Sequence, residues 1–314
     1  MHNDNESMRI LFVLLASATA QYVRPLQNLI DELPLSPPST DPVTTKMRLP
    51  SKKNILRFLW YASATYCDNG QTEKWNCTSC KLGNKNLKYY MKLKNQQFNT
   101  LGYVALDHEE RMILIVFRGT RGIENVLLDS DFIPSRFKYV PDPKNRVHSG
   151  FINAMESLAP QFMAALERLH TSPHYRQYKI GIVGHSLGGS MACLAAIKIH
   201  TVFQIPWSQI ELITYGQPRT GNRAFAEWFD AQPLASARVV NYNDFVPHIY
   251  GAFINDFVHH QNEVFFDIVN GKKKLRYCNN KVLEDPKCSN RVPNSEYSIL
   301  SHLSYMKPGF EAPC

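Results

Sequence analysis

Gly184-His185-Ser186-Leu187-Gly188 decides the fold, because this pentapeptide separates a predicted strand from a predicted helix. Residues 179–183 before it are mostly apolar, and residues 187–200 after it are rich in small and apolar residues, as in a helix packed against a sheet. In this context the G-x-S-x-G sequence predicts a nucleophile elbow, a sharp turn that exposes the serine hydroxyl. Its two glycines leave room for strand and helix to approach closely. The alternative is an ordinary strand-to-helix turn in which Ser186 has no chemical role.

Strand-like and helix-like segments alternate along the rest of the chain. The apolar, strand-like segments are 102–107, 112–117, 211–215, 238–242 and 263–267. Apolar residues recur at helical spacing over 151–169, and residues 55–66 also have a helical pattern. Alternating strands and helices favour an α/β fold with a mainly parallel sheet, in which the first two strands form an antiparallel hairpin. The length suits one domain of about 260 residues better than two small domains.

The first 50 residues differ in composition from the rest. Residues 10–20 form an apolar run that is too short to span a bilayer and that ends in Ala18-Thr19-Ala20, an A-x-A pattern. This run predicts a signal peptide over residues 1–20 and therefore a secreted, extracellular protein, although a buried core helix is the alternative. Residues 21–50 are proline-rich and are interpreted as a surface arm or a pro-segment. The folded domain is expected over residues 51–314.

Seven cysteines suit an oxidising compartment and favour disulfide bonds. The CxxC sequence at 77–80 is compatible with half a zinc site or a redox pair. No second CxxC or close histidine pair accompanies it, so we expect a local disulfide and no metal. The other expected pairs are Cys278–Cys288, which bracket a polar, turn-prone loop, and Cys67–Cys314, which would join the two ends of the domain. Cys193 lies within the predicted helix after the elbow and is expected to be a buried free thiol.

The formal charge of +8 raises the question of a polyanionic partner. Neither a helix-turn-helix pattern nor a set of stacking aromatics accompanies the basic residues, so nucleic acid is not an expected partner. Basic runs such as Lys272-Lys273-Lys274 are typical of solvated loops. Attraction to anionic lipid surfaces is the electrostatic interaction that this charge leaves open.

A serine hydroxyl needs a base that takes its proton and an acid that orients the base. Asp244 is the best-placed acid, because it follows the predicted strand 238–242 and therefore lies at its carboxyl end. Asp256 and Asp267 are less well placed. An aspartate at the end of a strand is also a common turn residue, so position alone leaves both interpretations open.

The base is expected to follow the acid in the chain, in the order serine, aspartate, histidine. The histidines after Asp244 are His248, His259, His260 and His302. His248 follows the aspartate too closely without a tight return, and the pair at 259–260 precedes a predicted strand, where a structural role is easy to explain. His302 lies in a predicted late loop that is free to fold back over the sheet, so we favour it.

The negative charge of a tetrahedral intermediate needs fixed hydrogen-bond donors. The backbone N–H of Leu187, directly after the serine, is one candidate. Thr120 is the other, because it follows the predicted strand 112–117 and offers both a backbone N–H and a hydroxyl. The alternative is that Gly119-Thr120 is only a turn.

Taken in order, several short motifs resemble the fungal-type class 3 lipases from about residue 55 onward. They are Tyr66-Cys67, Trp75-Asn76-Cys77 with Cys80, Val116-Phe117-Arg118-Gly119-Thr120, Val147-His148-Ser149-Gly150-Phe151, Gly184-His185-Ser186-Leu187-Gly188-Gly189, Tyr215-Gly216-Gln217-Pro218-Arg219-Thr220-Gly221-Asn222, Asn243-Asp244-Phe245-Val246-Pro247-His248 and Ser301-His302-Leu303-Ser304-Tyr305. Each motif alone is modest, whereas the ordered set is highly specific.

The resemblance implies an α/β-hydrolase fold over residues 51–314. It implies Ser186, Asp244 and His302 as a catalytic triad and Thr120 and Leu187 as oxyanion donors. It also implies the three cysteine pairs given above. His148 and Arg219 match family positions near the site but outside the triad, and are interpreted as structural supports.

A short amphipathic lid usually follows the early oxyanion residue in this family. Ile123, Val126 and Leu127 fall on one helical face, as a lid that turns an apolar side to lipid requires. The family tends to carry a tryptophan where Val126 stands, which puts interfacial activation in doubt. A surface helix without a gating role is the alternative.

Together these features predict a secreted serine esterase, and most specifically a triacylglycerol lipase that acts through an acyl-enzyme on Ser186. Its substrate would be a lipid ester at an oil–water or membrane interface. We expect a monomer without a stable protein partner and without a metal or organic cofactor. The alternatives are a phospholipase or feruloyl-type esterase on the same fold, or a non-catalytic secreted binding protein that keeps the hydrolase scaffold.

Overall fold

The computed structural model describes residues 48–67, 69–120, 133–249, 256–270, 272–279 and 281–305. The predicted signal peptide, nearly all of the proline-rich arm, the lid candidates Ile123, Val126 and Leu127, and Cys314 lie outside these residues. Within them, no helix has both the length and the apolar character that a bilayer span requires.

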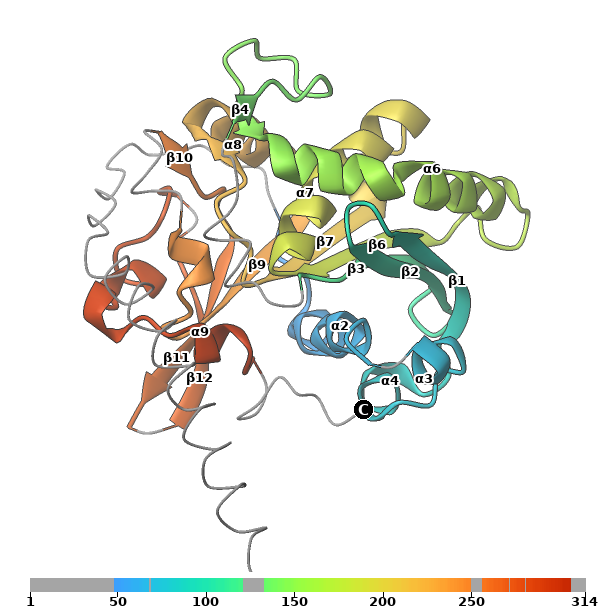
Figure 1. Cartoon of the computed structure of the whole chain (residues 1–314), viewed down its shortest axis with the longest axis horizontal. Helices are drawn as coiled ribbons and strands as arrows, with labels where there is room; N and C mark the ends of the chain where they lie inside the picture. The colour runs from blue at the N-terminus through green and yellow to red at the C-terminus, as the bar shows by residue number, and fades with distance from the viewer. Residues whose placement is uncertain are drawn as a thin grey trace, which may run out of the picture.

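A mainly parallel sheet runs through the centre of the molecule (Figure 1). In the described part of the chain it has eight strands in the order β1-β2-β3-β6-β7-β9-β11-β12. Strands β3 to β11 pair in parallel, whereas β1-β2-β3 at one edge and β11-β12 at the other pair antiparallel. The strands are β1 (Lys88–Asn95), β2 (Thr100–Asp107), β3 (Met112–Phe117), β6 (Lys179–His185), β7 (Ile210–Tyr215), β9 (Ala235–Asn241), β11 (Glu263–Val269) and β12 (Lys272–Tyr277).

The predicted mainly parallel sheet with an early hairpin is confirmed, but the strands at both edges were not predicted. In β1 and β12 lysine, arginine and tyrosine residues fill most positions, so neither segment shows the apolar run of a central strand. Charged side chains are typical of edge strands, because they discourage pairing with another chain.

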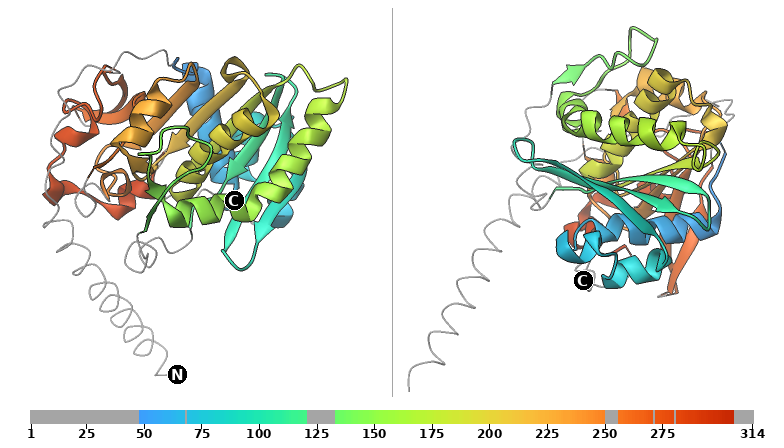
Figure 2. Two further views of the ribbon diagram at one scale, coloured as in Figure 1. Left: turned by 90° about the horizontal axis from the view of Figure 1, so that it is seen from above. Right: turned by 90° about the vertical axis from the view of Figure 1, so that its right-hand side faces the viewer.

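Helices cover both faces of the sheet, as Figures 1 and 2 show. Helices α6 (Ser149–Thr171), α7 (Leu187–Phe203) and α8 (Arg223–Asp230) bury side chains in the core on one face, and α2 (Lys52–Ala64) does so on the other. Side chains of one strand alternate between the two cores: in β3, Ile113 and Ile115 face α6 and α7, whereas Leu114 and Val116 face α2. The predicted helices at 55–66 and 151–169 are confirmed as α2 and α6, with ends shifted by a few residues.

Smaller elements surround the sheet. A second sheet pairs four short strands among the residues that the structure describes, namely β4 (Pro134–Ser135), β5 (Val147–His148), β8 (Gly221–Asn222) and β10 (Phe257–Val258). The remaining helices in the described ranges are α3 (Asn69–Glu73), α4 (Thr78–Asn84), α9 (Ile299–His302) and the 3₁₀ turns η1 (Trp207–Gln209), η2 (Val246–His248), η3 (Ser289–Arg291) and η4 (Asn294–Glu296).

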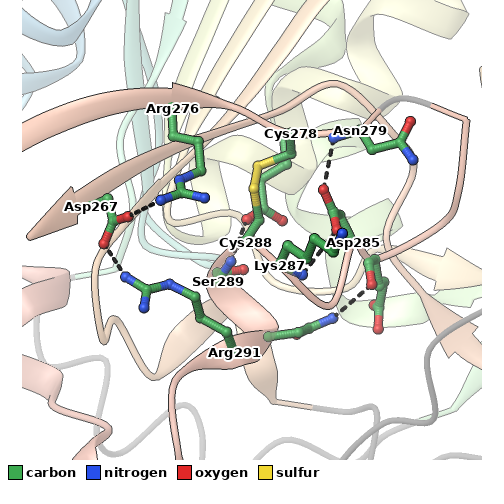
Figure 3. Close-up of a disulfide and its surroundings, with 12 residues drawn as sticks. Asp267, Arg276, Cys278, Asn279, Asp285, Lys287, Cys288, Ser289 and Arg291 are labelled. Carbon is green, nitrogen blue, oxygen red and sulfur yellow. Dashed lines mark hydrogen bonds and ion pairs between the residues drawn. A yellow bond between two sulfur atoms is a disulfide. The ribbon is translucent and has the colours of Figure 1, made fainter. Parts of the chain in front are cut away.

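Disulfide bonds join Cys77 to Cys80 and Cys278 to Cys288, which confirms two of the predicted pairs. Figure 3 shows the second of them. Cys67 is also disulfide-bonded, while its predicted partner lies outside the described residues. Cys193 is a buried free thiol in α7, as predicted.

Candidate active site

Ser186 occupies the turn between β6 and α7, and its backbone has φ 59° and ψ −131°. A positive φ is strained for a residue with a side chain and is characteristic of functional turns. Hydrogen bonds hold the turn: the Ser186 N–H donates to the carbonyl of Tyr215 at 2.9 Å, and the Gly189 N–H donates to the Ser186 carbonyl at 2.8 Å. The neighbouring strand β7 therefore fixes the position of the serine.

The glycines on either side of the serine are required by close packing. A Cβ atom on Gly184 would lie 1.9 Å from the carbonyl oxygen of Gly188, and one on Gly188 would lie 2.4 Å from the carbonyl oxygen of Phe117. Both contacts involve backbone, which cannot move aside as a flexible side chain can. The end of β3 is thereby packed against the turn, as the elbow prediction requires.

Asp244 and His302 form a buried hydrogen-bonded pair. Nδ1 of His302 lies 2.9 Å from Oδ2 and 3.0 Å from Oδ1 of the aspartate, and both side chains are almost fully buried. The carboxylate also accepts hydrogen bonds from the Tyr305 hydroxyl at 2.5 Å and from the Val246 N–H at 2.9 Å. Four hydrogen-bond contacts therefore fix the carboxylate and, through it, the imidazole. The loop predicted around His302 is wrong in detail, because the residue ends the single-turn helix α9, which the Ser298 side chain caps.

The C-terminal segment that carries His302 is tied to the segment that carries Asp244. Asn241, at the end of β9, donates its side-chain amide to the carbonyls of Ser301 at 2.7 Å and Ser304 at 3.2 Å. Gly216 lies beneath the pair with φ 56°, and a Cβ there would lie 2.7 Å from the imidazole and 2.8 Å from the carboxylate. The ends of β7 and β9 thus form the floor of the site.

The two atoms that would exchange a proton are both available. Ser186 Oγ and His302 Nε2 are buried and have no hydrogen-bond partner among the described residues. The His302 ring stacks on the ring of His185, with centroids 4.5 Å apart and planes 29° apart. The imidazole is therefore held against the residue that directly precedes the serine.

The two predicted oxyanion donors flank the same serine. Leu187 is the first residue of α7, where a backbone N–H has no acceptor within the helix. Thr120 is half-buried and follows Gly119, at which a Cβ would lie 2.7 Å from the Cβ of Ser186. The two segments with the predicted donors therefore both adjoin the serine.

The other acidic residues considered have partners of their own. Asp267 pairs with Arg276 at 2.8 Å and with Arg291, as Figure 3 shows. Asp256 is half-exposed and lies 3.6 Å from Arg223. Neither contacts His302 through a hydrogen bond or ion pair within the described chain.

The other histidines lie among buried structural contacts. His248 stacks on Tyr297, and Nε2 of His259 lies 2.7 Å from the carbonyl oxygen of Pro247. Burial lowers the pKa of His248 and that of His260 to about 3, which keeps both rings neutral. The structure therefore brings only His302, among these four, into contact with Asp244.

Arg219 and His148 hold backbone segments in place through buried contacts. The Arg219 guanidinium forms a buried, two-pronged ion pair with Glu284, at 2.6 and 3.1 Å, and donates to the carbonyl of His248 at 2.6 Å. Nδ1 of His148 accepts from the Gly150 N–H at 2.9 Å and so caps helix α6. These contacts are those of structural supports.

Sequence reasoning missed four residues around the site: Tyr66, His185, Glu284 and Tyr305. Glu284 lies inside the loop between two cysteines, where nothing in the local pattern indicates burial. The others stand in motifs quoted above, but only tertiary contacts reveal what their polar atoms bind.

Comparison with known proteins gives consistent similarities. A family profile described as Lipase (class 3) matches residues 114–253. A Rhizomucor miehei lipase is 32% identical over 232 residues, which are 74% of this chain and 61% of that protein. The chain thus spans less than two thirds of that relative's length.

Two further similarities concern structure and a shorter alignment. A solved structure, described as a triacylglycerol lipase whose catalytic centre is a serine protease triad, is 30% identical with a TM-score of 0.74, covering 85% of this chain and 99% of that one. A secreted mono- and diacylglycerol lipase of Gibberella zeae is 30% identical over 161 residues, which are 42% of this chain and 38% of that protein.

Proposed function

We propose that this chain, which belongs to the class 3 lipase family, hydrolyses carboxylic esters with Ser186 as nucleophile, His302 as general base and Asp244 as the acid that orients the base. The observation that carries the proposal is the buried Asp244–His302 pair, whose free Nε2 belongs to the same site as the strained Ser186 turn. An unpartnered buried nitrogen and hydroxyl are costly to a fold and therefore point to a chemical role.

In the first half of the proposed reaction, Ser186 Oγ attacks the ester carbonyl carbon while its proton moves to His302 Nε2. The carboxylate of Asp244 stabilises the imidazolium that forms. The carbonyl oxygen becomes an oxyanion, and the N–H groups of Leu187 and Thr120 would donate to it. When the C–O bond breaks, His302 returns the proton to the leaving alcohol, and the acyl group stays on Ser186.

In the second half, water attacks the acyl-enzyme. His302 Nε2 takes one proton of the water, and the same two N–H groups hold the second oxyanion. Collapse of this intermediate releases the carboxylic acid, and the proton on His302 returns to Ser186 Oγ. The cycle consumes one ester and one water and needs no further reactant.

A serine-reactive fluorophosphonate tests this assignment directly. We expect stoichiometric labelling of Ser186, located by peptide mass spectrometry, and no labelling of the Ser186→Ala variant. Ser190, buried in α7 four residues later, is a matched control position, and its Ser190→Ala variant should still be labelled. A folded protein that stays unlabelled would be a binding protein that keeps only the scaffold.

We further propose that the substrate is a triacylglycerol presented at a lipid–water interface. Support comes from the lipases to which the chain is similar. Initial rates on emulsified long-chain triglyceride, phosphatidylcholine micelles and a soluble short-chain ester distinguish the alternatives. Triglyceride is expected to be cleaved best, and a tenfold preference for either other substrate would replace the lipase assignment with a phospholipase or a soluble esterase.

Secretion is part of the proposal, with residues 1–20 as signal peptide, 21–50 as an arm or pro-segment and 51–314 as the hydrolase domain. It is supported by the A-x-A pattern, by the disulfides and by the secreted relative from Gibberella zeae. N-terminal sequencing of the protein from the culture medium of an expressing cell would locate the cleavage. A mature chain that begins before residue 20 would contradict the proposed processing.

A further inference from the structure

A chain of hydrogen bonds runs from the predicted oxyanion loop to the backbone of His302. The Gly119 N–H donates to the Tyr66 hydroxyl at 3.0 Å, and this hydroxyl lies 2.7 Å from Nδ1 of His185. On the other side of the same ring, Nε2 of His185 lies 3.0 Å from the carbonyl oxygen of His302. Two side chains thus connect two segments that are distant in sequence.

The acceptors fix the direction of these bonds. A carbonyl oxygen can only accept, so Nε2 of His185 carries the hydrogen and donates to His302. Burial, and the neighbouring His302, hold the pKa of His185 well below its usual range, so the ring is neutral and its Nδ1 accepts. The Tyr66 hydroxyl therefore donates to His185 and accepts from Gly119.

The packing around these hydrogen bonds leaves the residues that form them little freedom to move. A Cβ on Gly119 would lie 2.5 Å from the Tyr66 hydroxyl, 2.7 Å from the Cβ of Ser186 and 2.8 Å from the carbonyl oxygen of His185. The His185 ring also stacks on the His302 ring. A shift of the tyrosine would therefore move the loop before Thr120 and the support beneath the imidazole together.

We propose that Tyr66 and His185 are positioning residues that hold the oxyanion loop and His302 in one fixed relative geometry, an inference that rests on the proposed function. Tyr66 follows α2, which packs on the face of the sheet opposite to α7, so it links the site to a layer outside the elbow. The pair does not take up a proton, and its contacts with His302 are to the backbone carbonyl and to the face of the ring. It makes the N–H of Thr120 and the Nε2 of His302 point at the same tetrahedral intermediate.

The decisive variant is Tyr66→Phe, which removes the hydroxyl and keeps the ring. Because the lost contacts orient groups that act in the transition state, we expect kcat on a soluble ester to fall about 10- to 100-fold while KM changes less than about twofold. Tyr103→Phe is the matched control. The Tyr103 hydroxyl is also buried, and it donates to the carbonyl of Tyr61 at a distance of 2.9 Å, in a bond that lies outside the site. It should leave kcat unchanged although it loses a comparable bond.

His185→Gln changes the other side chain in the same series of hydrogen bonds. If both residues act through one chain, the double variant should lose no more activity than the more impaired single variant. Additive losses, an unchanged kcat in Tyr66→Phe, or an equal fall of kcat in Tyr103→Phe would each overturn the inference. If the wild-type protein fails to react with the fluorophosphonate, the proposed function is wrong, and this inference is wrong with it. If the wild-type protein is labelled normally and Tyr66→Phe keeps its kcat, only this inference is wrong.

Discussion

Tyr305 donates its hydroxyl to Asp244 Oδ2 at 2.5 Å, the same oxygen that lies 2.9 Å from His302 Nδ1. Burial and the charge of Asp244 hold the pKa of Tyr305 well above its usual range, so the hydroxyl keeps its proton and remains a donor. The carboxylate is therefore oriented in part by a residue only three positions after the histidine.

Replacement of this tyrosine by phenylalanine should reduce activity without abolishing it. Tyr305→Phe leaves Asp244 Oδ2 with fewer donors in a buried site, so the imidazole is less well oriented, and we expect kcat to fall about tenfold. The lost bond to a charged acceptor should also lower the free energy of unfolding by about 2 kcal/mol. Steady-state kinetics and urea denaturation measure the two effects, and an unchanged kcat would show that Val246 and His302 suffice to orient the carboxylate.

The strained backbone of Ser186 gives a second prediction. Ser186→Ala and Ser186→Gly both remove the hydroxyl and should abolish ester hydrolysis. Only glycine relieves the positive φ of 59°, so Ser186→Gly should be more stable than Ser186→Ala by about 1 kcal/mol, after the greater chain entropy of glycine is allowed for. Chemical denaturation of the two inactive proteins measures the difference. Equal stabilities would mean that the turn stores little strain.

Much of the fold could be predicted from local pattern. The central strands carry continuous apolar runs, and α6 has a regular apolar stripe, so both could be recognised from period and length. Edge strands β1 and β12 could not, because their alternation of charged and aromatic residues is weak and pairing with β2 and β11 stabilises them. The short helix α9 could not be predicted either, since four residues carry too little periodic signal.

The candidate site was predictable to the extent that chain order and strand ends determine it. Asp244 was chosen as a residue at the end of a strand and His302 by its order in the chain, and the two are in hydrogen-bonding contact. Their catalytic roles remain a proposal. The contacts of Tyr66, His185 and Tyr305 depend on tertiary packing, which no local pattern encodes.

The Cys278–Cys288 disulfide should contribute more to stability than the Cys77–Cys80 disulfide. It closes the longer loop, with a sequence separation of 10 against 3. From loop entropy, the variant with serine at both 278 and 288 should lose about 3 kcal/mol of unfolding free energy. The control variant with serine at both 77 and 80 should lose about 2 kcal/mol. The longer loop also carries Glu284, which binds Arg219 and the N–H of His259. A looser loop would weaken these contacts, which should add to the loss of unfolding free energy. Thermal unfolding of both variants tests the order, and a larger loss in the control pair would contradict it.

His148 should make stability depend on pH between about 6.5 and 4. Burial lowers its pKa from 6.5 to about 4. Between these pH values the histidine is protonated in the unfolded chain and neutral in the folded chain. Stability is therefore lost as the pH falls from 6.5 to 4, by about 3 kcal/mol for this group, and no further below pH 4.

His148→Asn removes the titration while keeping a side-chain acceptor at the start of α6. The difference in unfolding free energy between wild type and variant, measured by urea denaturation at several pH values, should change across this window. Other buried histidines titrate in both proteins and cancel, so a constant difference from pH 7 to 4 would mean that the folded protein accommodates the charged ring.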